Sequence, residues 1–461
     1  MEFDTKTRPS YTSDKTSFAY ISARDRWPVI LTGAIDDVHR AVSESTDEEK
    51  RTEGKRIVED LAKLNPLPDD GKPDIASYNK ELEQLGSPSW FNIPWLYAEC
   101  YLYRRIATAF ALSSHWKQYD IFARQKMSTF RSSRPAVLEL AGRYHELIKQ
   151  MENKGNKSQE ELDAAEKILF MEMCEICLWG NATDLSLLTS LTYEDIQKLQ
   201  GSEARKASEK NIIANDLEAA YSTLKKAKSE GKKYRQVDIV LDNAGFELYV
   251  DLILAGFLLS SGLATNIILH PKAIPWFVSD VVPRDFADLL NALANPQPFY
   301  STPSEDEVAA GKTPTPLSQQ EMDELAFLFK TWSEFHSEGQ LMLRTSTFWT
   351  EGGSYWRLPS SAPKLYEDLK ESEIVIFKGD LNYRKLTGDG TWDPTTPFTT
   401  AIGPLGPGSG VNVLALRTCK ADVVVGLKPG LDEELKGEDK SGKREWAWSG
   451  KWAVCSFSDG K

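Results

Sequence analysis

Apolar residues along this chain follow two patterns, helical spacing in the first part and short continuous runs in the second. In the first part, residues 26–42 and 95–112 each fit one helix, and β-branched runs are scarce. Beyond residue 200, short apolar runs rich in β-branched residues predict strands buried on both faces. These runs cover residues 237–241, 264–270, 373–377 and 411–416. The patterns predict an all-helical N-terminal domain over residues 1–200 and an α/β domain over residues 201–461.

The strand expected over residues 237–241 ends abruptly in two oxygen-bearing side chains, Asp242 and Asn243. Gly245 eases a tight connection, and residues 247–259 can continue as an apolar helix, so we expect a Rossmann-like three-layer α/β/α fold. Ligands in open α/β sheets bind at the carboxyl ends of strands, which predicts a metal or phosphate site here. An Asp-Asn turn that caps the helix is the structural alternative.

Other strand ends in the second part also deliver polar side chains. Asp280 follows the short apolar segment 276–279, the strand over 373–377 runs into Lys378-Gly379-Asp380-Leu381-Asn382-Tyr383-Arg384-Lys385, and the run over 411–416 is closed by Arg417-Thr418-Cys419-Lys420. The recurrence of polar side chains at several strand ends is stronger evidence for a ligand site than any single strand end.

The residue types at these ends suit phosphate chemistry. Asp242, Asn243 and Asp280 offer the hard oxygen ligands that a magnesium- or manganese-type ion prefers. A guanidinium such as Arg384 or Arg417 offers a planar fork to phosphate oxygens, whereas the Lys420 ammonium is a compact charge. Together they predict a metal-assisted phosphoryl-transfer site.

Three long motifs resemble the damage-control phosphatase family. They are Asp242-Asn243-Ala244-Gly245-Phe246-Glu247, Lys378-Gly379-Asp380-Leu381-Asn382-Tyr383-Arg384-Lys385-Leu386 and Arg417-Thr418-x-Lys420-Ala421-Asp422. Shorter agreement extends the resemblance over nearly the whole chain, at Ser17-Phe18-Ala19-Tyr20, Arg26-Trp27-Pro28 and Gly180-Asn181-x-x-Asp184-Leu185-Ser186. The most similar branch is the eukaryotic one, also described as an acidic-residue, or protein-glutamate, O-methyltransferase.

This resemblance implies a metal-dependent phosphatase of small phosphometabolites, with fructose 1-phosphate and related sugar phosphates as the expected substrate class. It implies a divalent cation, Mn²⁺, Co²⁺, Ni²⁺ or Mg²⁺, as the cofactor. Carried over by position, the metal ligands are Asp242, Asn243 and Asp280, and the catalytic set is these three with Lys420. The implied substrate pocket comprises Arg26, Glu247, Asp380, Leu381, Asn382, Tyr383, Arg384, Arg417 and Lys420.

Hydrolysis of a phosphate monoester requires charge neutralisation and an in-line arrangement of the attacking and leaving oxygens. The nucleophile is either a water molecule made more acidic by the cation or the carboxylate of Asp242 itself. In the second case, Glu247 or Asp280 would have to carry the proton. The residues alone do not choose between these two routes.

Bulk properties restrict the class of protein further. The 461 residues are enough for two to three domains and a sizeable core. A formal charge of -13 argues against nonspecific binding to nucleic acid or to an anionic membrane. The first six residues lack a signal-peptide layout, so we expect a cytoplasmic location, with a nuclear one left open. Polar residues interrupt the apolar stretch 250–269, so a buried helix and strand fit better than a membrane span.

The sulfur and imidazole side chains predict little chemistry. Five cysteines do not make a disulfide framework, so free thiols are expected. Cys174 and Cys177 form a CxxC, but they lie in an apolar helical pattern without a second pair. His270 follows the strand run near the proposed site, where we expect a strand-end or supporting role instead of metal ligation.

Several features of the helical part and the loops add expectations. Ser158 and Glu161 predict a capping box for a helix ending near Trp179. The aromatic residues over 90–103 fit a core better than a ligand cage, and Asn181 and Asp184 are candidates to organise the active site. We expect long polar loops over residues 301–320 and 391–410. Each is either a lid over the site or a loop without a functional role.

Three functional classes fit these observations. A metal-dependent sugar-phosphate phosphatase is favoured because metal-type oxygens and phosphate-type cations recur at strand ends. An S-adenosylmethionine-dependent protein carboxyl methyltransferase is the alternative that the resemblance raises, but the first strong strand ends in Asp-Asn and not in a glycine-rich turn. A noncatalytic phosphometabolite-binding protein is the third.

Overall fold

A seven-stranded mixed sheet forms the centre of the molecule. The computed structural model describes the chain except for residues 1–2, 62–66, 87, 153–157, 181–208 and 438–442. The strands are β1 (Ile212–Asn215), β2 (Gln236–Val240), β3 (Asn266–His270), β4 (Leu341–Leu343), β5 (Ser372–Lys378), β6 (Val413–Thr418) and β7 (Ala453–Ser458). Their order is β1-β7-β6-β5-β2-β3-β4, and β6 and β7 are the antiparallel neighbours among otherwise parallel pairs.

The strand order reverses its direction at β2. The chain passes from β2 to β3 and β4 on one side, whereas β5 and β6 lie on the other side. Val240 therefore pairs with His270 of β3 and with Phe377 of β5. Such a reversal opens a crevice at the carboxyl ends of the two central strands, which is where α/β sheets bind ligands.

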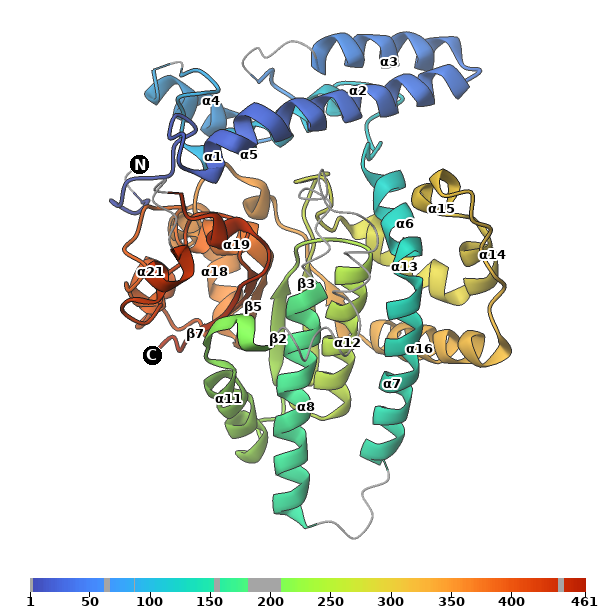
Figure 1. Ribbon diagram of the computed structural model, residues 1–461, viewed down its shortest axis with the longest axis vertical. Coiled ribbons are helices and arrows are strands. Elements are labelled where there is room, and N and C mark those ends of the chain that lie inside the picture. Colours follow the sequence, from blue (N-terminus) through green and yellow to red (C-terminus); the bar gives the residue numbers. More distant parts are fainter. Residues whose placement is uncertain (1–2, 62–66, 87, 153–157, 181–208, 438–442) are drawn as a thin grey trace.

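Helices cover both faces of this sheet. Side chains on the two faces of β2 enter different cores, with Val237 and Ile239 in one and Val240 in the other. The first face is packed by α7 (Arg134–Glu152), α8 (Gln159–Gly180), α11 (Leu217–Ser229), α12 (Phe246–Ser260), α13 (Pro283–Ala294) and α16 (Gln319–Ser337). The second face is packed by α17 (Leu358–Ser361), α18 (Pro363–Lys370), α19 (Gly379–Leu386), α20 (Phe398–Ala401) and the one-turn helices near 347–357, 403–405 and 445–448. The expected α/β/α layering is confirmed (Figure 1).

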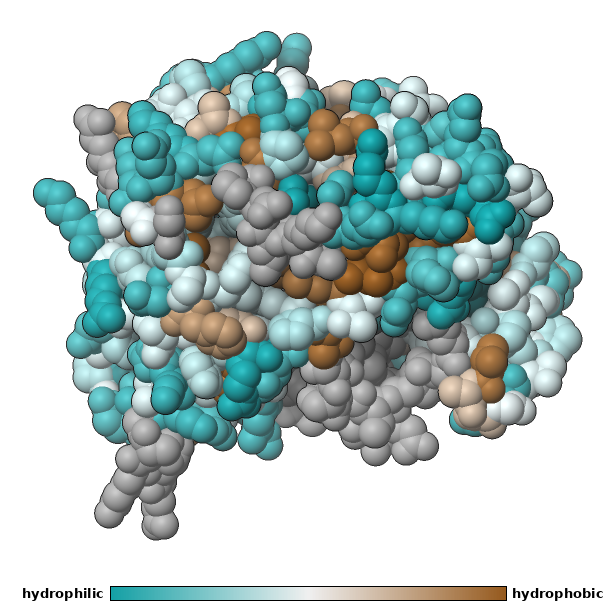
Figure 2. Space-filling view, turned by 90° about the horizontal axis from the view of Figure 1, so that it is seen from above, coloured by the Kyte–Doolittle hydropathy of each residue, from teal (hydrophilic) through white to brown (hydrophobic). Residues whose placement is uncertain are grey.

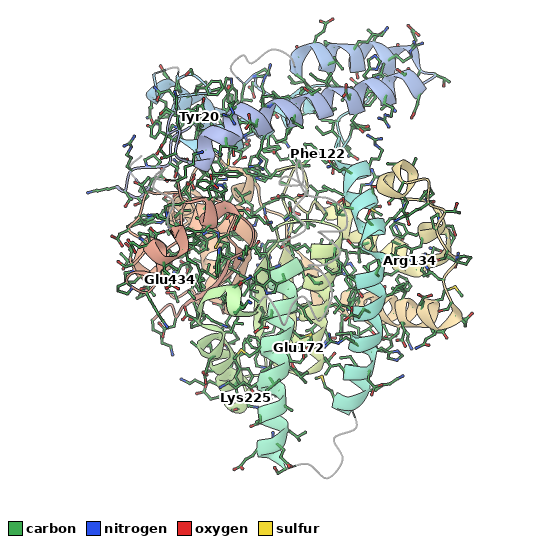
Figure 3. The ribbon with its side chains drawn as sticks, viewed as in Figure 1. Tyr20, Phe122, Arg134, Glu172, Lys225 and Glu434 are labelled. Atoms are coloured by element: carbon green, nitrogen blue, oxygen red, sulfur yellow. The ribbon has the colours of Figure 1, made fainter. Side chains whose placement is uncertain are left out.

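The N-terminal helices lie above the carboxyl edge of the sheet (Figure 1). They are α1 (Phe18–Ile21), a π-helical turn (Ser22–Arg26), α2 (Trp27–Glu44), α3 (Glu48–Leu61), α4 (Asp74–Gln84) and α5 (Trp95–Ala111). These helices share a core that extends to Phe122, whereas α7 and α8 belong to the core of the sheet. Figure 3 shows Phe122 where the N-terminal layer meets α6 (Ala123–Ser132). The packing of the apolar side chains thus changes near residue 122.

The aromatic residues of α5 are mostly core, as expected. Trp95, Tyr97, Tyr101 and Tyr103 are buried in the N-terminal core, whereas Phe91 before the helix is exposed. From above, most side chains on this face are hydrophilic, and apolar ones gather in a band across its middle (Figure 2).

An N-terminal strap, residues 4–17, ties the first residues to the end of the chain. Asp4 accepts hydrogen bonds from Arg357 and Ser354, and its pKa lies below the ordinary value because the Arg357 charge outweighs the effect of burial. The strap then forms bridges from Pro9 to Gly390 and from Tyr11 to Pro94. It ends at Ser17, which caps α1.

The predicted strands and helices are found with small shifts, and three strands were not predicted. β1 and β4 have four and three residues, and β7 alternates Ser with apolar residues, so none shows a long apolar run. The capping box of α8 is confirmed, because Glu161 N–H donates to Ser158 Oγ and Ser158 N–H to Glu161 Oε2. No helix in the described part has the length and apolarity to cross a membrane. Asn181 and Asp184 lie outside the described residues.

The two stretches expected as long loops carry short helices. α15 (Glu305–Ala309) lies in the first, and α20 with the turn Gly403–Leu405 lies in the second. Their role as lids stays a prediction.

Candidate active site

One small pocket collects most of the predicted site residues. It lies at the carboxyl ends of β2 and β5, beneath the N-terminal helices. Its lining comprises Arg26, Trp95, Glu99, Asp242, Asn243, Phe277, Asp280, Asp380, Leu381, Arg384 and Lys420. Four residues predicted for the pocket from the motifs do not line it: Glu247, Asn382, Tyr383 and Arg417. The lining therefore joins segments that are up to nearly 400 residues apart in the sequence.

The oxygen ligands come from the end of β2 and from the segment that faces it. Asn243 and Asp280 form an antiparallel bridge, and Val281 N–H donates to the Asp242 carbonyl at 2.8 Å. Asp242 and Asp280 are 4% and 1% exposed. Two carboxylates and one amide are thereby held at one wall of the pocket.

The segment that carries Asp280 has a strained backbone. Phe277 and Val278 have φ angles of 43° and 69°, a region that residues with a Cβ atom rarely adopt. Phe277 stacks on Tyr103 with ring centroids 4.6 Å apart, and both rings are buried in the N-terminal core. Such strain persists only where the surrounding packing fixes it, and here it turns Asp280 back toward β2.

A hard divalent cation fits this wall by the chemistry of its donors. Asp242, Asn243 and Asp280 supply carboxylate and amide oxygens, the set that Mg²⁺ and Mn²⁺ prefer, and the remaining positions of an octahedron would fall to water or substrate. Lys272 is the buried cation beside them, with Nζ 3.2 Å from Asp280 Oδ2 and 2.5 Å from the Leu241 carbonyl. Within the described residues, no group of three His, Cys, Asp or Glu side chains makes a metal cage. A metal site at this wall would therefore need the amide oxygen of Asn243 in addition to the two carboxylates.

Cationic side chains stand on the other walls of the pocket. Arg26 ends the π-helical turn, lies over the Phe18 ring at 5.4 Å and donates to Ser22 Oγ at 3.2 Å. π-helical turns often occur at functional sites, and this one places an arginine at the pocket. Lys420 follows β6, and its backbone N–H donates to Asp380 Oδ1 at 3.0 Å. Both cations are nearly buried, at 9% and 4% exposure.

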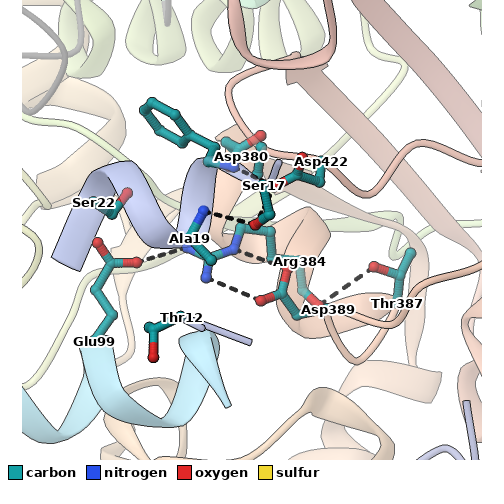
Figure 4. Close-up of polar contacts among 12 residues, drawn as sticks. Thr12, Ser17, Ala19, Ser22, Glu99, Asp380, Arg384, Thr387, Asp389 and Asp422 are labelled. Atoms are coloured by element: carbon teal, nitrogen blue, oxygen red, sulfur yellow. Dashed lines mark hydrogen bonds and ion pairs between the residues drawn. The ribbon is translucent and has the colours of Figure 1, made fainter. Parts of the chain in front are cut away.

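Arg384 is held on all sides by protein groups. Its Nη1 donates to Glu99 at 2.8 Å, and its Nε and Nη2 donate to Asp389 at 3.1 Å each (Figure 4). The guanidinium also lies 3.5 Å above the ring of Trp95. Burial alone would lower the pKa of Arg384, but the charges of Asp389 and Glu99 outweigh it and keep the group charged. Arg384 therefore joins α5 to α19 at the pocket, with its charge balanced by two carboxylates.

The other motif residues support this lining from behind. Arg417 donates to Asp380 at 2.7 Å and lies 4.2 Å from the centre of the Tyr383 ring. The Asn382 amide donates to the carbonyls of Val240, Leu241 and Lys378, which fixes the ends of β2 and β5 together. Glu247 is fully buried and accepts from Asn243 Nδ2 at 2.8 Å and from Lys378 Nζ at 2.9 Å. These residues fix the positions of the groups that face the pocket.

The N-terminal strap closes the site through Asp422. Its Oδ2 accepts from Ser17 Oγ at 3.1 Å and from the Phe18 N–H at 3.0 Å (Figure 4). Burial raises the pKa of this carboxyl to about 7, although both hydrogen bonds act to lower it. The last residue of the third motif thus anchors the helical turn that delivers Arg26.

Comparison with known proteins agrees with the motifs. The model of the Damage-control phosphatase ARMT1-like domain matches residues 22–435. The chain belongs to this family. It is 37% identical to Damage-control phosphatase ARMT1 of Xenopus laevis and 34% identical to that of Homo sapiens, over 96% of this chain and 96% and 97% of those proteins. A DUF89 family protein from Pyrococcus horikoshii is 13% identical, with a TM-score of 0.42 over 94% of this chain and 97% of that one, too low to support an argument.

Three charged residues in or beside the pocket of this ARMT1-like protein were not singled out from the sequence as site residues: Glu99 lines the pocket, and Asp389 and Lys272 pair with residues that line it. Glu99 gave one signal, an acid within the apolar run of α5. Asp389 sits in a Gly-Asp-Gly turn with φ 50°, which suggests a simple turn, yet it is buried and pairs with Arg384. Lys272 follows His270-Pro271 at a strand end, and a lysine there could have been recognised by the strand-end rule.

His270 and the CxxC cysteines lie outside the lining of the ARMT1-like pocket. His270 Nε2 is 2.6 Å from Asp238 Oδ1, within the second-face core. Cys174 and Cys177 are buried, and burial raises the pKa of both thiols. Their placement fits structural roles.

Proposed function

We propose that this protein is a metal-dependent phosphoric monoester hydrolase that acts on small sugar phosphates such as fructose 1-phosphate. Membership of the ARMT1-like damage-control phosphatases supports a phosphatase that repairs or clears metabolites. The observation that carries the finer proposal is the composition of one pocket. Asp242, Asn243 and Asp280 stand on one wall, and Arg26 and Lys420 on others.

Each wall would have a separate task in the reaction. Asp242, Asn243 and Asp280 would hold a divalent cation, which supplies Lewis acidity and compensates the charge of the phosphoryl group. Arg26 and Lys420 would bind phosphoryl oxygens, because an ammonium and a guanidinium both donate to them. The charge that develops during phosphoryl transfer would then be surrounded by fixed positive groups in a nearly buried site.

The sugar would be recognised at Asp380 and the apolar wall. Arg417 and the backbone N–H of Lys420 both donate to Oδ1 of Asp380, and Oδ2 of this carboxylate, which lines the pocket, would accept from a sugar hydroxyl. Trp95, Phe277 and Leu381 supply apolar surface for the C–H groups of a small ring or chain. This division favours a polyhydroxylated phosphate ester over an aryl phosphate.

Release of inorganic phosphate is the test of this proposal. Full-length protein stripped with a chelator is supplied with Mn²⁺, Co²⁺, Ni²⁺ or Mg²⁺ and assayed on a panel of sugar phosphates and one aryl phosphate. Asp242→Asn and Asp280→Asn should abolish turnover, because each removes one ligand charge. Asp432→Asn is the matched control, since Asp432 is a nearly buried carboxylate that pairs with Arg444 and Lys436 outside the pocket.

The outcomes separate the candidate functions. Metal-restored release from sugar phosphates, lost in the two pocket variants alone, supports the proposal. Binding of sugar phosphate without release by folded protein would favour a binding protein. Wild-type rates in Asp242→Asn or Asp280→Asn would contradict the site assignment.

A further inference from the structure

Asn243 is the one proposed metal ligand whose side chain has two chemically different ends. Only the oxygen of an amide binds a cation, because the NH₂ group is a donor without a lone pair for metal binding. Its Nδ2 donates to Glu247 Oε2 at 2.8 Å and to Asp242 Oδ2 at 3.1 Å, and its Oδ1 accepts from Ser279 Oγ at 2.5 Å. The affinity of the site thus depends on which way this amide faces.

Glu247 and Asp242 both accept from the NH₂ end of Asn243, at 2.8 Å and 3.1 Å, and Glu247 is the nearer of the two and the one that is not itself a proposed ligand. A carboxylate oxygen only accepts, so Oε2 of Glu247 requires the NH₂ end of Asn243 to face it. Ser279 does not fix the orientation of the Asn243 amide, because a hydroxyl can either donate or accept. Glu247 is 0% exposed, so no solvent molecule competes with this contact.

Lys378 fixes Glu247 in turn. Its ammonium lies 2.9 Å from Glu247 Oε1 and 2.7 Å from Asp251 Oδ1, and it also donates to the Cys177 carbonyl at 3.1 Å. An ammonium only donates, so the group that faces Lys378 must accept. One oxygen of Glu247 is thereby assigned to Lys378 and the other to Asn243.

We propose that Glu247, held by Lys378, is a positioning residue that sets the amide orientation of Asn243 and through it the affinity of the site for a divalent cation. The inference rests on the proposed role of Asn243 as a ligand. Under this proposal Glu247 does not contact the substrate but controls the metal site, and Lys378 contributes by holding Glu247 in place.

Glu247→Gln tests this positioning role directly, because it replaces one carboxylate oxygen by an NH₂ group. Lys378 still requires an acceptor, so the oxygen of the new amide stays on Lys378 and its NH₂ group faces Asn243. Two NH₂ groups cannot face each other at hydrogen-bond distance, so Asn243 turns over and presents Nδ2 to the cation. Disturbance of a group that orients a ligand commonly costs 10–100-fold in metal affinity, and we expect a loss of roughly that size.

A second substitution should reverse the loss. In Glu247→Gln with Asn243→Asp, residue 243 has two oxygens, so one accepts from the Gln amide and the other remains for the cation. Asn243→Asp alone places two carboxylates against each other, so it should also bind metal weakly. The double variant should therefore bind more tightly than either single variant, a coupling that independent damage to the fold would not produce.

The experiment is a titration of chelator-treated, full-length protein with Mn²⁺, followed by calorimetry and by the Mn²⁺ spin-resonance signal. Asp251→Asn is the matched control, because it alters the other partner of Lys378 and leaves Glu247 against Asn243. We expect near wild-type affinity for the control, a roughly 10–100-fold loss for Glu247→Gln and recovery in the double variant. Circular dichroism establishes that each variant is folded.

The results distinguish this inference from the proposed function. If the wild-type protein binds no divalent cation under any condition, the proposed metal site fails. If the wild type binds Mn²⁺ and Glu247→Gln binds it equally well, only the positioning role fails. Should Glu247→Gln not fold, the double variant compared with Asn243→Asp decides, and equal affinities of these two would overturn the inference.

Discussion

Replacing Asp422 by Asn should remove a defined part of the pH dependence of stability. The half-buried carboxyl has a pKa of about 7 in the folded protein and an ordinary value of 3.8. The folded state therefore keeps a proton that the unfolded state has lost, so the stability associated with this group falls as the pH rises from about 4 to 7. The full difference corresponds to about 4 kcal/mol, because one pKa unit is about 1.4 kcal/mol.

The measurable window is narrower than this full range. Between pH 5 and pH 8 the same relation gives a loss of about 2–3 kcal/mol for the wild-type group. Asn at position 422 can accept the hydrogen bonds from Ser17 and Phe18 through its amide oxygen, but it does not titrate. Relative to the wild type, the variant should thus gain about 2–3 kcal/mol of stability between these two pH values.

Urea unfolding at pH 5, 6, 7 and 8, followed by intrinsic fluorescence, would measure the difference. Asp422→Ala is a useful companion, since it removes both the charge and the hydrogen bonds and should be destabilising at low pH. A constant difference in the free energy of unfolding between wild type and Asp422→Asn across the pH series would refute the assigned pKa and the reasoning from burial.

Three further outcomes follow from the pocket. Arg384→Ala leaves Glu99 and Asp389 buried without their cation, so the free energy of unfolding should drop by about 3–5 kcal/mol in a denaturant titration; a loss under 1 kcal/mol would contradict the tight ion pairing. Asp380→Asn should lower kcat/KM for sugar phosphates about 10–100-fold and leave the aryl phosphate rate nearly unchanged, since a single hydrogen bond to a charged group contributes about 1.5–3 kcal/mol; equal losses on both substrates would remove the sugar role. Mn²⁺ at 100 times its Kd should raise the unfolding free energy of wild-type protein by about 2.7 kcal/mol and that of Asp280→Asn much less, measured as thermal shifts with and without chelator; identical shifts would exclude Asp280 as a ligand.

Much of the sheet could be predicted because its central strands are buried on both faces. β2, β3, β5 and β6 appear in the sequence as apolar runs, and each of the four leads into a polar segment that contributes to or supports the site. The edge strand β4 has only three residues, too few to give a periodic signal. Short strands depend on their neighbours for pairing, so a single sequence carries little information about them.

The candidate site could be predicted in its residue types but not in its division of roles. Asp380 and Arg417 belong to separate motifs of polar residues, yet Asp380 faces the pocket and Arg417 lies behind it. Which of two charged residues faces a cavity depends on long-range contacts, such as the stacking of Arg417 on Tyr383. Glu99 was missed for the same reason, because its role appears only when α5 and α19 meet.

The contacts of the N-terminal strap determine when the pocket can form during synthesis of the chain. Ser17 and its partner Asp422 are 405 residues apart in the sequence. Asp4 likewise cannot form its ion pair until Arg357 has been synthesised. The helical turn that bears Arg26 leaves the ribosome early but cannot reach its final anchor until almost the whole chain has been made. A truncated or stalled chain would thus contain many folded helices and still lack a closed pocket, so catalytic competence would arrive only with the last segment of the protein.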